Sequence, residues 1–143
     1  MLVIVYGLTY LATALVFLGI DSIWLSVTAG LLYRPLLGGL LRDDFDPIAA
    51  VFFYALYIGG IVVFVIAPSI AVSSRRVVAI RGAFFGLVAY ATYDLTNQAT
   101  LRGWPLGITI ADLCWGAVLT AVAAVAGHAV ASRLSRGKAA SVR

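Results

Sequence analysis

Charged residues and cysteine are scarce in this sequence of 143 residues. Only 11% of its residues are charged, whereas 63% are hydrophobic, and the mean hydropathy is +1.06. Soluble domains use about 25% charged residues, so a soluble enzyme and a nucleic-acid-binding protein are both excluded. The single cysteine, Cys114, excludes an intramolecular disulfide and any thiol oxidoreductase that needs paired cysteines. A secretory signal normally carries Lys or Arg before its apolar core, and the first apolar run here has neither. We therefore expect that run to be retained as a helix.

Four long apolar segments occupy most of the chain. Each contains about 20 residues or more, which is enough for a helix to cross about 30 Å of hydrocarbon. The sequence therefore predicts an all-α, four-helix transmembrane bundle in residues 1–132, with the lipid bilayer as its surroundings. A basic tail, residues 133–143, follows it. The expected spans are about 2–32, 48–71, 77–101 and 106–131.

The ten Lys and Arg residues are unevenly distributed among the connections. An even number of spans places both termini and the second loop on one side, and that side carries seven of the ten. Positive charge in short loops marks the cytoplasmic side. We therefore predict that both termini, and with them the basic tail, are cytoplasmic in a multi-pass inner-membrane protein. The net charge of +4 then reflects membrane orientation, and no nucleic-acid partner is expected.

An unusually polar stretch, residues 90–104, closes the third span. An aspartate at the centre of a membrane helix costs about 2.5 to 3.5 kcal/mol on insertion scales, so Asp94 needs a partner or a water-filled pocket. Helical spacing places Tyr90, Asp94 and Asn97 on one face, and Tyr93 flanks that face. Ionisable residues inside membranes commonly mark functional sites.

The pattern D-x-x-W occurs twice, at Asp21/Trp24 in the first span and at Asp112/Trp115 in the fourth. With cytoplasmic termini, Asp94 and Asp112 both lie roughly 10 Å below the outer boundary, and Asp21 is late enough in its helix to reach the same level. We therefore predict an outward-facing acidic and aromatic pocket. Its predicted residues are Asp21, Trp24, Tyr90, Tyr93, Asp94, Asn97, Asp112 and Trp115. No metal site is predicted, and the sequence leaves any cofactor open.

Small residues recur at helical spacing in the last two spans. Gly82 and Gly86 form a small-xxx-small pair, and Gly116 begins a second stripe with Ala123 and Gly127. Such faces let helices approach closely, so we predict helix packing at Gly82, Gly86 and Gly116. The same faces also offer surfaces for a homo-oligomer. The second span, which has no charge, is interpreted as a packing helix.

Basic residues near the predicted pocket are few. Arg34 and Arg102 are candidates to pair with its aspartates, although a position at the membrane interface suits both side chains better. His128 is expected at the cytoplasmic interface. At the start of the second span, Asp46 is predicted to be the N-cap and Pro47 the first helical residue.

Several motifs together resemble those of a family of predicted bacterial membrane proteins known as domain of unknown function 2177. They are Leu11–Ala14, Asp21–Leu25, the string GLVAYATYDLTN at 86–97, Ala99–Leu101, Trp104-Pro105 and Asp112–Gly116. The resemblance covers nearly the whole chain. It implies a four-helix bacterial inner-membrane protein, and it brings no activity or catalytic residues.

The aspartates are open to a structural and to a functional interpretation. As structural groups they would hold helices together through hydrogen bonds. As functional groups they best fit binding or transport of a small molecule, a cation or a proton. One alternative is an intramembrane enzyme in which an aspartate pair acts on a lipid or lipid-linked substrate. A second is a non-catalytic membrane subunit that contacts a partner protein, so whether the chain is an enzyme stays open.

Overall fold

The computed structural model describes residues 2–71 and 74–140, and in these ranges all regular structure is helical. Four long helices form the body of the molecule: α1 (Leu2–Thr28), α3 (Pro47–Gly60), α4 (Arg75–Thr100) and α5 (Leu106–Ala140). Short segments extend α1 and α3. They are the π-helical turns η1 (Ala29–Tyr33) and η3 (Ile61–Ile66), the short helix α2 (Arg34–Leu37), and the 3₁₀ turns η2 (Gly38–Leu40) and η4 (Ala67–Ser69).

Four helical segments of the described chain are long and apolar enough to cross a membrane: Val3–Leu40, Pro47–Ser69, Arg75–Thr100 and Leu106–Arg136. Their outward side chains are large and apolar, with Leu15 and Leu56 each 75% exposed. A soluble monomer rarely exposes so much apolar surface, whereas a protein surrounded by lipid does so regularly. The predicted all-α, four-helix membrane fold is therefore confirmed, and the orientation of its termini stays a prediction.

Two helices continue beyond the expected span limits. The turns η1, α2 and η2 carry the first helical segment on from residue 32 to Leu40. Helix α5 runs past residue 131 to Ala140, so most of the expected tail is helical; Arg143 lies outside the described residues. The limits of the membrane spans themselves stay a prediction. The predicted start of α3 is confirmed, because the Asp46 carboxylate accepts hydrogen bonds from the backbone N–H groups of Ile48 and Ala49, each at 3.1 Å.

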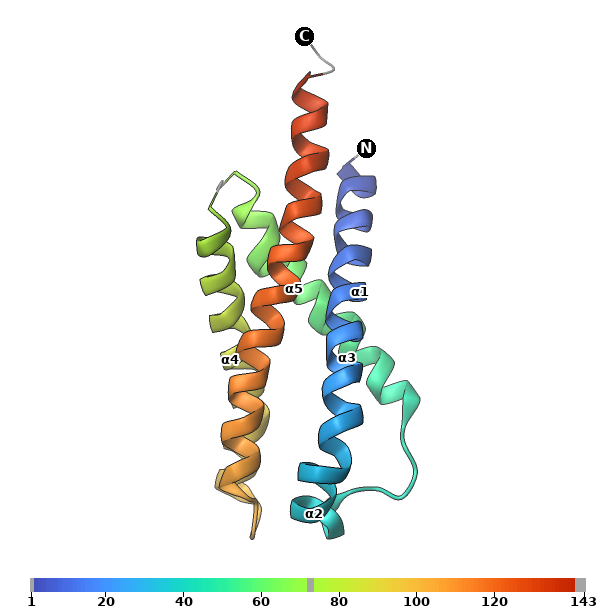
Figure 1. The fold of residues 1–143 in the computed structure, drawn as a ribbon, viewed down its shortest axis with the longest axis vertical. Helices are drawn as coiled ribbons and strands as arrows, with labels where there is room; N and C mark the ends of the chain where they lie inside the picture. Colours follow the sequence, from blue (N-terminus) through green and yellow to red (C-terminus); the bar gives the residue numbers. More distant parts are fainter. Residues whose placement is uncertain (1, 72–73, 141–143) are drawn as a thin grey trace.

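Helices α4 and α5 form a closely packed antiparallel hairpin, and α1 lies along the opposite side of α5 (Figure 1). The glycines explain the close approach. A Cβ added at Gly86 would lie 2.1 Å from the carbonyl oxygen of Gly116, and one added at Gly116 would lie 2.3 Å from the ring of Tyr90. One added at Gly82 would lie 3.0 Å from Ala121 Cα. All three positions predicted for helix packing thus lie at the α4–α5 contact.

The remaining small-residue positions also pack within the chain. Ala123 is fully buried, and a Cβ added at Gly127 would lie 2.1 Å from the hydroxyl oxygen of Thr13 in α1. These faces are therefore occupied by neighbouring helices of the same molecule. They are not free surfaces for a second copy, as the sequence had suggested, and a homo-oligomer would need another face.

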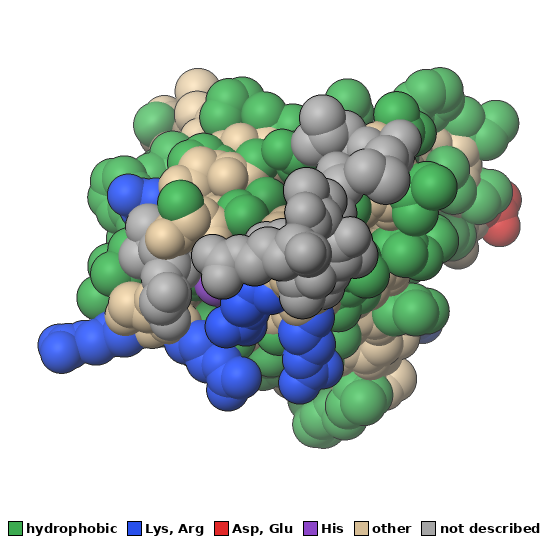
Figure 2. All heavy atoms as spheres, turned by 90° about the horizontal axis from the view of Figure 1, so that it is seen from above, with side chains coloured by type: hydrophobic (Ala, Val, Ile, Leu, Met, Phe, Trp, Pro, Cys, Tyr) green, Lys and Arg blue, Asp and Glu red, His purple; other side chains and the backbone are tan. Residues whose placement is uncertain are grey.

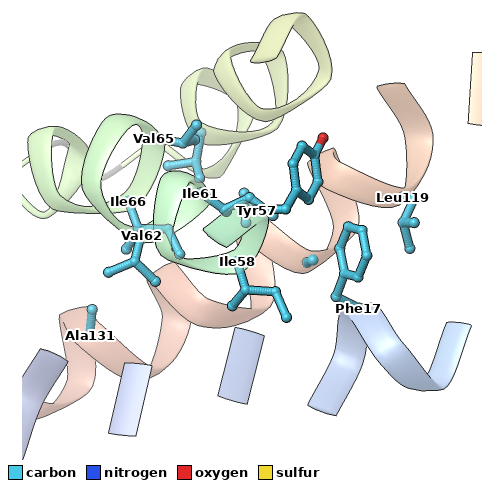
Figure 3. Packing of buried hydrophobic residues seen from close by; sticks show 12 residues of the cluster. Phe17, Tyr57, Ile58, Ile61, Val62, Val65, Ile66, Leu119 and Ala131 are labelled. Atoms are coloured by element: carbon cyan, nitrogen blue, oxygen red, sulfur yellow. The ribbon is translucent and has the colours of Figure 1, made fainter. Parts of the chain in front are cut away.

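Helix α3 crosses behind α1 and α5 at an angle, so that its continuation η3 lies in the bundle while its first turns diverge from it (Figure 1). The hydrophobic core forms where η3 meets α1 and α5. Phe17 from α1 faces Tyr57 from α3, with ring centroids 5.3 Å apart, and Leu119 of α5 packs nearby (Figure 3). Because only this part of the α3–η3 segment is held in the core, space remains beside the first turns of α3.

Candidate ligand-binding site

The two D-x-x-W motifs meet across the α1–α5 contact. Trp24 and Trp115 stack with their ring centroids 4.3 Å apart and their planes 8° from parallel. The Nε1–H of Trp115 donates to Oδ1 of Asp21 at 2.9 Å, and the hydroxyl of Tyr54 donates to Oδ2 of the same carboxylate at 2.7 Å. Asp21 therefore joins α1, α3 and α5, and it is only 6% exposed.

Asp112 is held by a second chain of hydrogen bonds. The hydroxyl of Tyr33, the last residue of η1, donates to Oδ1 of Asp112, and the Nε1–H of Trp24 donates to that hydroxyl at 3.2 Å. Each tryptophan thus connects to the aspartate of the other motif, Trp115 directly and Trp24 through Tyr33. Among the described residues no donor reaches Oδ2 of Asp112.

A cavity of about 480 Å³ lies beside these groups, between α1, η1, α3, α4 and α5. This volume falls within the range of about 300–1,000 Å³ that is usual for small-molecule sites. The lining is mostly aromatic, and its two ionisable acids are Asp21 and Asp112. The lining residues are Asp21, Trp24, Leu25, Tyr33, Phe53, Tyr54, Tyr57, Ala89, Tyr90, Tyr93, Asp112 and Trp115.

One side of the cavity faces the outside of the bundle. Its rim is formed by Leu25 of α1, Phe53 of α3 and Tyr93 of α4, which are 41%, 48% and 60% exposed. The ring of Tyr93 packs edge-on against Trp104 at a centroid distance of 5.7 Å. In a membrane, side chains exposed at the surface of the bundle border on lipid or its headgroups, so the rim of the cavity is open to these surroundings.

Sequence comparison bears on the same residues. A family model with the description "Predicted membrane protein (DUF2177)" matches residues 6–129, a range that includes every predicted pocket residue. The chain belongs to the DUF2177 family. The description carries no activity. Neither the comparison with curated proteins nor that with solved structures gives a match.

In this DUF2177 member, six of the eight predicted pocket residues line the cavity and two do not. Asn97 is half-buried away from the lining. Asp94 is fully buried and is not part of the lining, and among the described residues neither of its carboxylate oxygens has a hydrogen-bond partner. The six that line the cavity are Asp21, Trp24, Tyr90, Tyr93, Asp112 and Trp115.

Neither candidate counter-charge reaches the aspartates of the DUF2177 site. Within residues 2–71 and 74–140 the one ion pair joins Arg42 to Asp46, at 3.9 Å in an exposed loop. Arg34 instead lines a second, open cavity of about 780 Å³, which the loop after η2 borders. The two cavities share Leu25 and Tyr33, so Tyr33 stands between the loop and the aromatic cavity.

Four aromatic side chains of the site were not predicted: Tyr33, Phe53, Tyr54 and Tyr57. The predicted first span ends before Tyr33, and the second span is predicted to be a packing helix alone. Tyr57 does pack in the core, where its hydroxyl lies 2.8 Å from that of Thr120, but one side of it also lines the cavity. The signal was present in the sequence, because three aromatic residues at 53, 54 and 57 share one face of an uncharged helix.

His128 lies at the other end of this DUF2177 bundle and is unrelated to the cavity. It is buried between helices, at 4% exposure, and its expected position at the level of the cytoplasmic interface stays a prediction. Its Nε2 lies 2.9 Å from the carbonyl oxygen of Ser69 and 3.2 Å from the hydroxyl of Ser132. Arg81 donates to the Ser69 hydroxyl at 3.0 Å. These bonds connect η4, α4 and α5, which explains the burial of the ring.

Proposed function

We propose that the protein binds a hydrophobic organic cation in the cavity between α1, α3, α4 and α5. One observation carries this proposal: the charged groups of the lining are two carboxylates, and no Lys or Arg lies among the lining residues. An anionic ligand would meet only repulsion there. A cation would gain an ion pair and would need no other counter-charge.

The aromatic lining supports the same ligand class. Tryptophan and tyrosine rings attract cations through their negative faces, by about 0.5–2 kcal/mol for each well-placed contact. Two stacked tryptophans and four tyrosines from α3 and α4 border the cavity beside the two acids. The apolar remainder favours a ligand with hydrophobic groups, and the exposed rim gives such a ligand a route from the bilayer.

The two acids have different roles in this proposal. Both oxygens of Asp21 already accept hydrogen bonds, so this carboxylate mainly holds α1, α3 and α5 together. Asp112 accepts on Oδ1, and its Oδ2 remains for the ligand. We assign the ion pair to Asp112 and a supporting electrostatic contribution to Asp21.

Binding of tetraphenylphosphonium to the purified protein in detergent, measured by calorimetry, tests the proposal. Asp112→Asn should weaken binding roughly thirtyfold, since losing a buried charge pair costs about 2 kcal/mol or more. Asp44→Asn, which removes the same charge from an exposed loop position, is the matched control and should bind as the wild type. Tetraphenylborate, of similar shape and opposite charge, should not bind. Equal affinity for both ions would show that the cavity selects hydrophobicity alone.

We also propose that both termini face the cytoplasm of a bacterial cell. The end of the bundle that carries the termini also gathers arginine side chains (Figure 2). Helix α4 contributes three and α5 two: Arg75, Arg76, Arg81, Arg133 and Arg136, all exposed. This bias supports the proposed orientation, which places the cavity in the outer half of the membrane. Alkaline phosphatase should be active when fused in the loop at Asp44 and inactive when fused after Arg143; the reverse pattern would refute the orientation.

A further inference from the structure

Asp94 differs from the other two acids of the bundle in having no hydrogen-bond partner. It lies on α4, six residues before the helix ends at Thr100, and its exposed fraction is 0%. Both of its carboxylate oxygens are buried and accept no hydrogen bond from any described residue. Asp21 accepts two bonds and Asp112 accepts one. An ionised carboxylate buried without any donor costs several kcal/mol, so Asp94 requires a positively charged partner or a proton.

The surroundings of Asp94 contain no positive charge among the described side chains. Helix α5 and η3 pack on α4. From α5 the ionisable group that acts on Asp94 is Asp112, which is itself negative; η3, residues 61–66, has none. On α4 itself the ionisable neighbour is Tyr93. Beyond these, Asp21 of α1 acts on Asp112, adding to the negative charge of the site.

A metal ion does not fit the position. No group of three or more His, Cys, Asp and Glu side chains is placed to hold one in residues 2–71 and 74–140. A single carboxylate without further ligands is a poor site for a metal ion that must shed its water. A proton needs only one oxygen and no further ligand. A proton therefore fits a carboxylate that, like Asp94, is buried and has no hydrogen-bond partner among the described residues.

We propose that Asp94 is a proton-binding site and that occupation of the neighbouring cavity by a cation releases its proton. The first part stands on Asp94 alone, and the second rests on the proposed cation site. In the empty protein the O–H bond of Asp94 is intact. When a cation pairs with Asp112, its positive charge lowers the cost of an ionised Asp94. The O–H bond then breaks and the proton passes to water. One positive charge replaces another, so the net charge of the site is unchanged.

Hairpin geometry supports the link between the two acids. Asp94 is six residues before the end of α4, and Asp112 is six residues after the start of α5 at Leu106. At 1.5 Å per residue both lie about 9 Å from the turn. They therefore share one level on two helices in close contact. Within a medium of low dielectric constant, charges on two such neighbouring helices interact strongly.

Infrared spectroscopy of the ligand-free protein tests the first part directly. The wild type at neutral pH should show the C=O stretch of a protonated carboxylic acid, shifted on exchange into D₂O. Asp94→Asn should lose this band, and Asp94→Leu should lose it too, which covers the case in which one variant fails to fold. Asp44→Asn should retain it. Absence of the band from the wild type, or its persistence in both Asp94 variants, would overturn the proton site.

Proton release on ligand binding tests the second part. Titration of the wild type with tetraphenylphosphonium in buffers of different ionisation enthalpy should show about one proton released per bound cation. Asp94→Leu should still bind the cation but release none. Binding without release in the wild type would overturn the coupling. If tetraphenylphosphonium does not bind at all, the cation site and the coupling both fail, whereas the infrared band still decides whether Asp94 holds a proton.

Discussion

Replacing Asp21 with alanine is expected to lower the free energy of unfolding by about 1–2 kcal/mol. The substitution removes the acceptor of two interhelical hydrogen bonds, from Tyr54 and from Trp115. Such bonds average about 0.6 kcal/mol each inside membrane proteins, which gives about 1.2 kcal/mol for the pair. Two half-buried donors that are left without acceptors raise the cost further.

A double-mutant cycle isolates one of these bonds. Asp21→Ala, Tyr54→Phe and the double variant are unfolded with SDS in mixed micelles, and the coupling energy between the two sites should be about 0.6 kcal/mol. Tyr10→Phe is the matched control, because the hydroxyl of Tyr10 donates to the carbonyl of Ala55, at 3.1 Å, and not to Asp21. Its coupling with Asp21→Ala should be near zero. An equal coupling energy with Asp21 for the two tyrosines would refute the hydrogen bond between Tyr54 and Asp21 as a specific connection between α3 and α1.

Two further substitutions test the packing and the aromatic lining. Gly86→Ala should destabilise the protein by about 1–3 kcal/mol, because its Cβ would lie 2.1 Å from the carbonyl oxygen of Gly116; Gly59→Ala, with nothing within 4 Å of the new atom, should show no loss in the same SDS titration. Tyr57→Phe should cost about 0.6 kcal/mol of stability through the lost contact with Thr120, yet should keep its affinity for tetraphenylphosphonium within about twofold, since the ring face remains. A large loss of affinity would show that the hydroxyl itself contacts the ligand.

The fold class could be predicted from the order of apolar and polar segments along the chain. Hydropathy and length determine which segments cross a membrane, and the structure has four such segments. The common level of Asp94 and Asp112 also followed from the chain, because a short turn between two antiparallel helices makes equal distances from that turn equal depths. The presence of Trp24 and Trp115 near the acids was predicted from spacing alone.

What the sequence did not predict depends on how helices pack sideways. The angle at which α3 crosses the bundle results from contacts in the core, such as those of Phe17 with Tyr57, and it determines that Tyr54 reaches Asp21. The burial of Asp94 outside the cavity lining likewise depends on the rotation of α4 against α5. Helical periodicity gives a face only to within the width of one side chain, which is too coarse to separate a lining residue from its buried neighbour.

The alternatives to a cation site lead to different measurements. If the cavity instead belongs to an enzyme acting on lipids, extracts of cells with and without the gene should differ by a defined lipid mass, and identical extracts would count against that activity. If the chain is a subunit without its own ligand, the wild type should not bind tetraphenylphosphonium, and loss of the gene should leave the lipid composition unchanged.

The widened turn η1 determines the direction in which Tyr33 faces. A π-helical turn amounts to one extra residue accommodated within an α-helix. If residues 29–33 were wound as regular α-helix without any deletion, Tyr33 and everything beyond it would lie about 100° further around the helix axis. The Tyr33 hydroxyl would then be directed away from Asp112, and Trp24 would lose its acceptor. The hydrogen bonds that connect η1 to α5 therefore depend on the wide turn as well as on the residues that make them.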